Sequence, residues 1–137
     1  MKLLKIVTIA SVFFFQSLAM AGLTQPAPVT IDLENLVATG DMVTARHSDN
    51  EFEFIGCGTR NSDTGSGDIF SFAFCQASVA EDSTVICTTF NPELVAKVSD
   101  INDSSFVSFR WNEDGECVSL GFSTQSFYMF MSKKDLK

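Results

Sequence analysis

The sequence predicts a mainly β fold, a single antiparallel sheet curled into a barrel or sandwich of about 6–7 strands, with one short helix and two disulfides. Three observations support this prediction. Apolar residues alternate along much of the chain, turn-forming segments recur between the alternating runs, and the cysteines number four, an even count. These features together are typical of small β domains that disulfides stabilise.

Residues 1–21 have the three parts of a secretory signal peptide. Lys2 and Lys5 make the start basic, residues 6–18 are apolar, and Ala19 and Ala21 are the small residues that signal peptidase reads. The apolar run is shorter than the roughly 20 residues that cross a bilayer. We therefore predict cleavage after Ala21, no membrane insertion of the remaining chain, and a periplasmic or secreted protein.

The chain without residues 1–21 would be strongly acidic. Loss of two lysines leaves seven basic residues against 17 acidic residues, a net charge of −10 with His47 neutral. Such a surface repels phosphates, so nucleic-acid binding is not expected. We divide the rest into an extended lead-in or short helix at 22–39, a disulfide-braced β domain at 40–132, and a solvated basic tail at 133–137.

Alternation and turn chemistry place the strands. Segments rich in Asp, Asn, Ser and Gly separate the apolar runs and favour turns. A helix over residues 91–101 interrupts the series, because Asn91 can cap its first turn and Pro92 fits its first position. The expected strands are residues 42–47, 51–59, 69–78, 84–90, 105–111, 116–123 and 127–131.

Alternation also separates large apolar residues from the cysteines. In the 69–78 strand, Phe70, Phe72 and Phe74 lie on one face and Cys75 lies on the other. The 14 phenylalanines of the chain suit an interior better than a binding surface. We therefore predict a Phe-rich interior on one side of the sheet, and disulfides between neighbouring strands on the opposite side.

Two structural disulfides are expected among Cys57, Cys75, Cys87 and Cys117. The chain contains no Cys-x-x-Cys pair, which argues against a redox-active or zinc-binding role. Two connectivities remain open. Cys75 faces Cys87 if the turn between their strands is tight, which leaves Cys57 with Cys117. Cys57 could equally face Cys75 across the 61–68 loop, which leaves Cys87 with Cys117.

No residue pattern assigns catalysis, a cofactor or a metal. His47 is followed by a serine and an aspartate, but neighbours in sequence do not make the geometry of a catalytic triad. Asn61, Asp63 and Asp68 offer oxygen ligands that suit calcium. Their loop lacks the acidic spacing of an EF-hand, so an ordinary hairpin loop is the preferred interpretation.

The order of the structural motifs resembles that of small exported bacterial proteins that contain disulfides and have no assigned activity. The resemblance covers residues 40–123 and implies a secreted or periplasmic β domain, with no catalytic residues to transfer. It depends on residues 55–57, residues 75–77, Cys87, the helix that begins at Asn91-Pro92, residues 109–111 and residues 115–117.

The leading functional expectation is a non-enzymatic binding or interaction module with a protein partner. A rigid sheet with polar loops can present contacts without chemistry. Phe106, Arg110 and His47 are the candidate contact surface. An inhibitor or immunity-type protein is the alternative, because an acidic surface can steer a basic partner. A hydrolase is less favoured, and the oligomeric state is left open.

Overall fold

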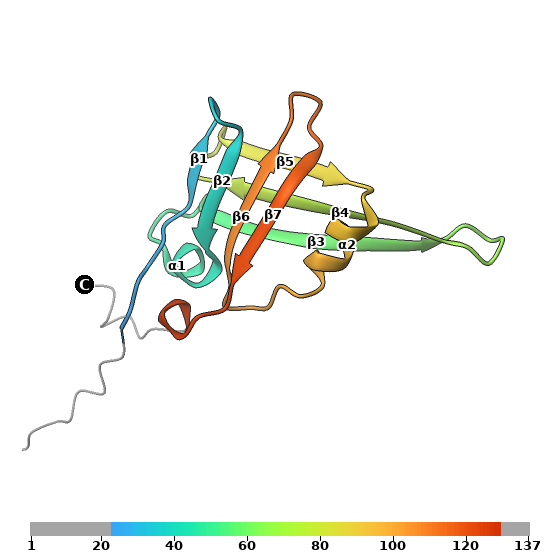
Figure 1. Ribbon diagram of the computed structural model, residues 1–137. Coiled ribbons are helices and arrows are strands. Elements are labelled where there is room, and N and C mark those ends of the chain that lie inside the picture. Colours follow the sequence, from blue (N-terminus) through green and yellow to red (C-terminus); the bar gives the residue numbers. More distant parts are fainter. Residues whose placement is uncertain (1–22, 130–137) are drawn as a thin grey trace, which may run out of the picture.

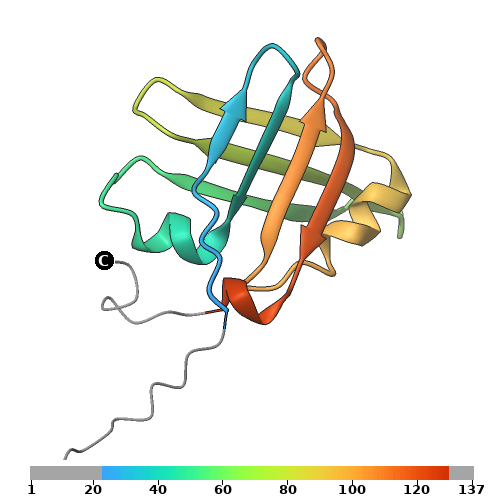
Figure 2. The ribbon, with the colours of Figure 1, turned by 60° about the vertical axis from the view of Figure 1, so that its left-hand side comes forward.

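A computed structural model describes residues 23–129, which form seven strands in two antiparallel sheets. Figures 1 and 2 show the strands of one sheet crossing those of the other. The four-stranded sheet has the order β1-β2-β6-β7, with bounds Thr30–Asp32, Val37–Asp41, Phe106–Trp111 and Cys117–Ser123. The three-stranded sheet has the order β3-β4-β5, with bounds Phe54–Asp63, Ile69–Ser78 and Thr84–Thr89.

The mainly β prediction is confirmed, but the prediction of one curled sheet is wrong. The two sheets meet at an isolated parallel bridge between Thr88 of β5 and Glu116, next to β7, and they do not close into a barrel. One bridge cannot make β5 and β7 into neighbours of a continuous ladder. The molecule is therefore built from two layers of strands (Figure 2), and the buried core residues come from both layers.

Most expected strands are present, because the turn-forming segments end them where the sequence indicates. The strand β4 has the predicted bounds, and β5, β6 and β7 agree within one residue at either end. The strand predicted at 51–59 begins later and extends to Asp63. The strand predicted at 127–131 is wrong for its described part, where a 3₁₀ turn, η1, covers Ser126–Tyr128.

The predicted strand at 42–47 is also wrong, because these residues form the helix α1, Met42–His47. Asp41 is its N-cap, and its Oδ1 accepts a hydrogen bond of 2.6 Å from the Thr44 N–H. An aspartate directly before the segment is a recognisable N-cap signal. The β-branched residues in Met42–His47 favour a strand locally, and the cap outweighs that preference.

The segment 22–39, expected to be a lead-in or a short helix, contributes β1 and most of β2 to the four-stranded sheet. The turn between these strands is organised by Asp32, whose carboxylate accepts bonds from the backbone of Glu34 and from the backbone and side chain of Asn35. The side-chain bond from Asn35, with the backbone bonds, lowers the pKa of Asp32 below its ordinary value.

The predicted helix is confirmed as α2, Pro92–Val98, which is shorter than the expected 91–101. The Asn91 side chain caps it by accepting a 2.9 Å bond from the Glu93 N–H. The helix packs mainly against β4 and beside β3 and β7 (Figure 1). It therefore covers part of the space between the sheets at the end that α1 leaves open.

Both carboxylate oxygens of Asp41 are used, although this side chain is only 1% exposed. Besides capping α1, its Oδ2 accepts a 2.6 Å bond from the Ala27 N–H and so holds the N-terminal segment to β2. Asp41→Ala should lower the free energy of unfolding by about 2–4 kcal/mol, because α1 loses its N-cap and the Ala27 N–H loses its acceptor. Urea denaturation measures this change in the free energy of unfolding. Asp32→Ala, at an exposed turn, is the control and should cost less; equal losses would contradict this role of Asp41.

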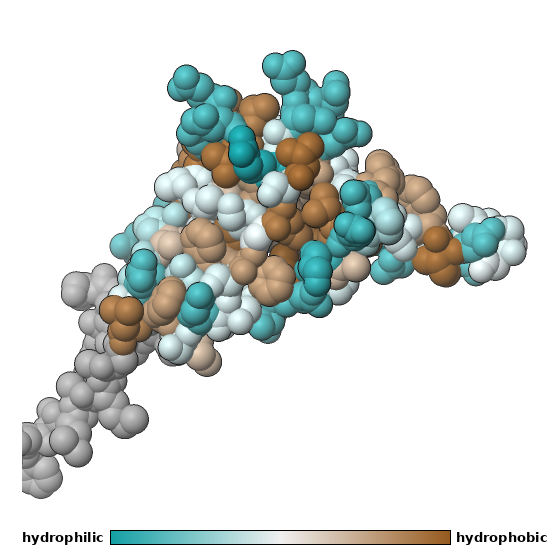
Figure 3. Space-filling view, in the orientation of Figure 1, coloured by the Kyte–Doolittle hydropathy of each residue, from teal (hydrophilic) through white to brown (hydrophobic). Residues whose placement is uncertain are grey.

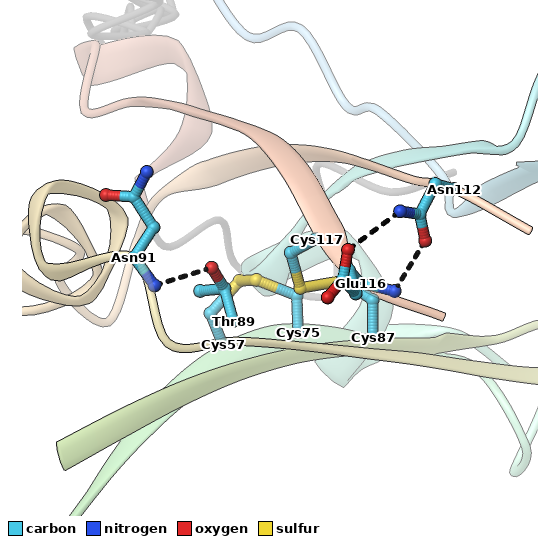
Figure 4. The surroundings of a disulfide bond; sticks show 8 residues. All are labelled: Cys57, Cys75, Cys87, Thr89, Asn91, Asn112, Glu116 and Cys117. Atoms are coloured by element: carbon cyan, nitrogen blue, oxygen red, sulfur yellow. Dashed lines mark hydrogen bonds between the residues drawn. A yellow bond between two sulfur atoms is a disulfide. The ribbon is translucent and has the colours of Figure 1, made fainter. Parts of the chain in front are cut away.

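The four cysteines line the space between the two sheets (Figure 4). Cys57 pairs with Cys75, and Cys87 pairs with Cys117, which is the second of the two connectivities that the sequence left open. The first disulfide joins β3 to β4 within one sheet, and the second joins β5 to β7 between the sheets.

The prediction of a Phe-rich interior is wrong for β4. The buried side of this strand carries Ala73, Cys75 and Ala77, each at most 2% exposed. The reason is the close approach of the sheets, since the Cα atoms of Cys87 and Cys117 are 5.0 Å apart, whereas packed sheets are about 10 Å apart. Phenylalanine rings do not fit where the two sheets come this close, so the small side chains of β4 face inward. Its three phenylalanines, Phe70, Phe72 and Phe74 (the Phe stripe), face outward.

In the part of the chain that the structure describes, no helix is long and apolar enough to cross a membrane. The predicted signal peptide at 1–21 and the predicted basic tail at 133–137 lie outside the described residues.

Candidate aromatic binding surface

The outward side of the three-stranded sheet carries a group of apolar rings that we name the aromatic face. The pairing register fixes its membership, because Cys57 and Cys75 face inward as partners and even-numbered residues of β3 and β4 therefore face outward. Phe70 is 49% exposed and Phe90, just after β5, is 62% exposed. The aromatic face consists of Phe70, Phe72, Phe74, Ile86 and Phe90.

Three of these rings contact one another. The ring centroids of Phe70 and Phe90 are 5.6 Å apart, and both rings lie about 6 Å from that of Phe72, at 6.1 and 6.0 Å respectively. Mutual contact limits the rotamers of these side chains, so the cluster presents a preformed apolar surface. Strand pairing on both sides of β4 holds its backbone in place.

Phe74 extends the aromatic face toward β3. Its ring lies over Gly58, where an added Cβ would be only 3.0 Å from the Phe74 Cζ atom. The guanidinium of Arg60 lies 4.8 Å from the centroid of the same ring, a cation–π distance. Glycine at position 58 is therefore what allows the ring to cross β3, and Arg60 holds it there.

The aromatic face differs in charge from the rest of the protein. The chain has 17 acidic residues, yet the outward positions of β3, β4 and β5 carry none of them. Arg60 is the one charged side chain at these positions. Carboxylates occur instead around the sheet, in the Asp63–Asp68 loop and at Glu81 and Asp82. The surface is thus an apolar centre with an acidic border.

The predicted contact residues belong to two elements, β6 and α1. Phe106 and Arg110 share the outer side of β6 about 13 Å apart, at four residues of about 3.3 Å each. Phe106 stacks on Tyr128 of η1, with centroids 5.4 Å apart, and Arg110 donates to the carbonyl of Asn35. His47 is half-buried at the end of α1, with Nδ1 2.8 Å from the Val43 carbonyl oxygen.

Ser48, which follows His47, directs its hydroxyl to a carboxylate. It donates to Oε2 of Glu53, and the other carboxylate oxygen of Glu53 accepts from the Val29 N–H. These bonds tie the N-terminal segment and α1 to the start of β3. They give Ser48 and Glu53 a structural role in this geometry.

The loop considered for calcium uses its carboxylates internally. Asp63 Oδ1 accepts a 2.7 Å bond from the Gly65 N–H, and Asp68 Oδ2 accepts a bond from the Ser66 hydroxyl. Gly65 and Gly67 have φ values of +82° and +91°, which glycine adopts without strain. Within residues 23–129, no group of three or more His, Cys, Asp or Glu side chains is placed to hold a metal ion.

Fold and surface together define a class: a two-sheet antiparallel β protein with buried disulfides and an exposed aromatic sheet face. No family model matches the chain, and no curated protein or solved structure matches it significantly. Sequence reasoning missed the aromatic face because it assigned the same residues to the interior. The signal was present in the small residues opposite the Phe stripe, which suit a close approach of two backbones.

Proposed function

We propose that this chain is an exported, non-enzymatic binding module that recognises a protein partner through the aromatic face, in the periplasm or outside the cell. The observation that carries the proposal is the contact of two exposed rings, Phe70 and Phe90, with the half-buried Phe72 on a paired sheet. Contiguous exposed apolar surface is uncommon in soluble proteins and marks interaction sites. The two disulfides fit an oxidising compartment.

The chemistry of the aromatic face favours a protein over other partners. Phenylalanine has no polar group for the hydroxyls of a sugar, and the acidic chain repels nucleic acids. Aromatic residues and arginine are enriched in protein interfaces, and Arg60 beside Phe74 provides this combination. The matching partner surface is an apolar patch with basic residues around it, since the border of the face is acidic.

An inhibitor or immunity-type protein remains the second candidate, favoured by a different surface. The β1–β2 turn and the β6–β7 turn lie at the same end of the four-stranded sheet, where Figure 3 shows hydrophilic side chains gathered. These turns carry Asp32, Glu34, Glu113, Asp114 and Glu116. Such an end could steer a basic partner electrostatically.

A capture experiment tests the aromatic face. The mature protein carries a photo-crosslinking residue at position 70 or 90 and is incubated with envelope and medium proteins of its source. We expect the same partner to crosslink at both positions. Phe70→Ser with Phe90→Ser should weaken binding about 30-fold or more, because interface aromatics contribute at least 1–2 kcal/mol each.

Leu33 provides the control, since it is 67% exposed in the β1–β2 turn, away from the aromatic face. A crosslinker at position 33 should not capture that partner, and Leu33→Ser should leave its affinity unchanged. If the double Phe variant still captures the partner and high salt abolishes that capture, then the aromatic face is not the binding site and the inhibitor hypothesis is supported.

A further inference from the structure

The strand β3 lies at one end of its sheet, so one of its edges has no neighbouring strand. The disulfide partners Cys57 and Cys75 have Cα atoms 4.0 Å apart, which identifies a non-hydrogen-bonded pair of the antiparallel ladder. The odd-numbered residues of β3 therefore direct their backbone N–H and C=O groups away from β4. These outward groups belong to Ile55, Cys57, Thr59 and Asn61.

The strand β5 at the opposite edge of the sheet supports this assignment of the backbone hydrogen-bonding directions. If the backbone N–H and C=O groups of Cys75 bond to β5 rather than to β3, then those of its partner Cys87 point back to β4. The backbone groups of the even-numbered residues of β5 must then point away from β4, toward the free edge. Thr88 does so, since its N–H donates a 3.1 Å bond to the Gly115 carbonyl in the β6–β7 turn. The edge at β5 is thus partly covered, whereas no backbone bond joins the outward groups of β3 to another segment within residues 23–129.

Natural sheets protect long free edges with proline, lysine, bulges or covering segments. The strand β3 contains no proline or lysine, and its pairing register runs without a shift from Phe54 to Asp63. Within β3, Arg60 protects the edge, because its Nη1 donates a 2.9 Å bond to the carbonyl of Thr59, and α1 lies beside the first residues of the strand. Arg60 is exposed, so a strand that approaches this edge can displace that bond.

A groove of about 550 Å³ lies beside the first residues of β3, and both ribbon views place α1 next to this part of the strand (Figures 1 and 2). Its lining combines apolar and polar side chains, and its carboxylates outnumber its cations by three to one. Lys97 with Asp100 forms the one ion pair within the described residues, so no salt bridge there neutralises these carboxylates. The lining includes Ala45, Arg46, Glu51, Glu53, Ile55 and Asp103.

We propose that the edge of β3 accepts an extended segment of a partner protein as a fourth strand, and that this segment alternates apolar and basic residues. Side chains of an added strand point alternately to the two sides of the sheet. The apolar ones would continue the aromatic face beside Phe54 and Phe74, and the basic ones would enter the acidic groove. This inference rests on the proposed function and names the chemistry of the partner.

Two copies of this chain are a poorer occupant than a basic segment. Each mature chain would carry a net charge of −10, so like charges oppose the pairing of two β3 edges. The β3 residues also offer only Arg60 as a cation for the partner groove. Charge complementarity therefore selects a different, basic chain.

The probe is a blocked eight-residue peptide of alternating valine and lysine, with alternating valine and glutamate as the charge control. A third peptide with the lysines and valines in two separate blocks keeps the charge and removes the alternation. We expect only the first peptide to bind, with slower hydrogen exchange of the Ile55, Cys57 and Thr59 amides. Equal binding of the first and third peptides would overturn strand addition.

Variants test the two parts of the site separately. Thr59→Pro removes an outward N–H and should weaken binding about tenfold, while Thr59→Val keeps the N–H and should bind within about twofold of the wild type. Glu51→Gln with Asp103→Asn should weaken binding and flatten its salt dependence. Glu113→Gln with Asp114→Asn, at the far turn, makes the same charge change and should have no effect.

The outcomes separate this inference from the proposed function. If the natural partner is lost with the Phe70 and Phe90 variants but kept by Thr59→Pro, then the aromatic face stands and strand addition is wrong. If both sets of variants keep the partner, then both proposals fail. Concentration-dependent dimers that Thr59→Pro abolishes, measured by sedimentation, would replace the basic partner with a second copy and overturn the inference.

Discussion

Phe109→Ala should lower the free energy of unfolding by about 3–5 kcal/mol, whereas Phe70→Ala should change it by less than about 1 kcal/mol. Phe109 is fully buried, and its register partners on the neighbouring strands are Ala38 and Leu120. Its ring also packs on Trp111, with centroids 5.8 Å apart. Truncation leaves a cavity among these groups that the two paired neighbours of β6 cannot close.

The comparison with Phe70 makes this prediction specific, because both variants remove the same ring. Phe70 is 49% exposed and contacts Phe72 and Phe90 on the outer side of β4. Urea denaturation followed by far-ultraviolet circular dichroism measures both changes without relying on the Trp111 signal. A larger loss for Phe70→Ala would mean that the Phe stripe is interior after all and that the aromatic face does not exist.

Removal of the disulfide between Cys87 and Cys117 should destabilise the protein more than removal of the one between Cys57 and Cys75. The loops that they close have sequence separations of 30 and 18 residues. The chain-entropy model assigns each disulfide about 3–4 kcal/mol, with a difference of only a few tenths. We expect a larger difference in stability, because the two pairs of strands differ in the other interactions that hold them together.

Cys57 and Cys75 lie on strands that remain paired along their full length without the disulfide. Cys87 and Cys117 lie on different sheets, which otherwise meet in that region through the Thr88–Glu116 bridge and the bond from Thr88 to Gly115. Replacing each pair with alanines and measuring thermal unfolding tests the order. A greater loss for the Cys57–Cys75 pair would contradict the view that the inter-sheet bond holds the two layers together.

The disulfide connectivity shows what alternation along a strand can and cannot predict. Cys75 is in register with Cys57 on one side and with Cys87 on the other, so both pairings place the cysteines on the same side of the sheet. In an antiparallel ladder, the non-hydrogen-bonded pair is the closer one, and Cys75 forms it with Cys57. The sequence contains no sign of which pairs are hydrogen-bonded, so it left both connectivities open.

The candidate site was missed for a related reason. Phe70, Phe72 and Phe74 were correctly placed on one side of β4 and the cysteine on the other. The error was to give the larger side chains to the interior, since burial of apolar area is the usual rule. The groove beside β3 depends on elements distant in sequence, such as α1 and the residue Asp103.

Local chemistry was sufficient for most of the strands and for α2, because alternation, turn residues and the Asn91-Pro92 cap act over a few residues. Asp41 shows that the same kind of evidence could also have found α1. The inside and outside of each strand, the partner of Cys75 and the open edge of β3 were not accessible in this way. They depend on which remote strand approaches each face and edge, and the 5.0 Å separation of Cys87 and Cys117 leaves room there only for small side chains.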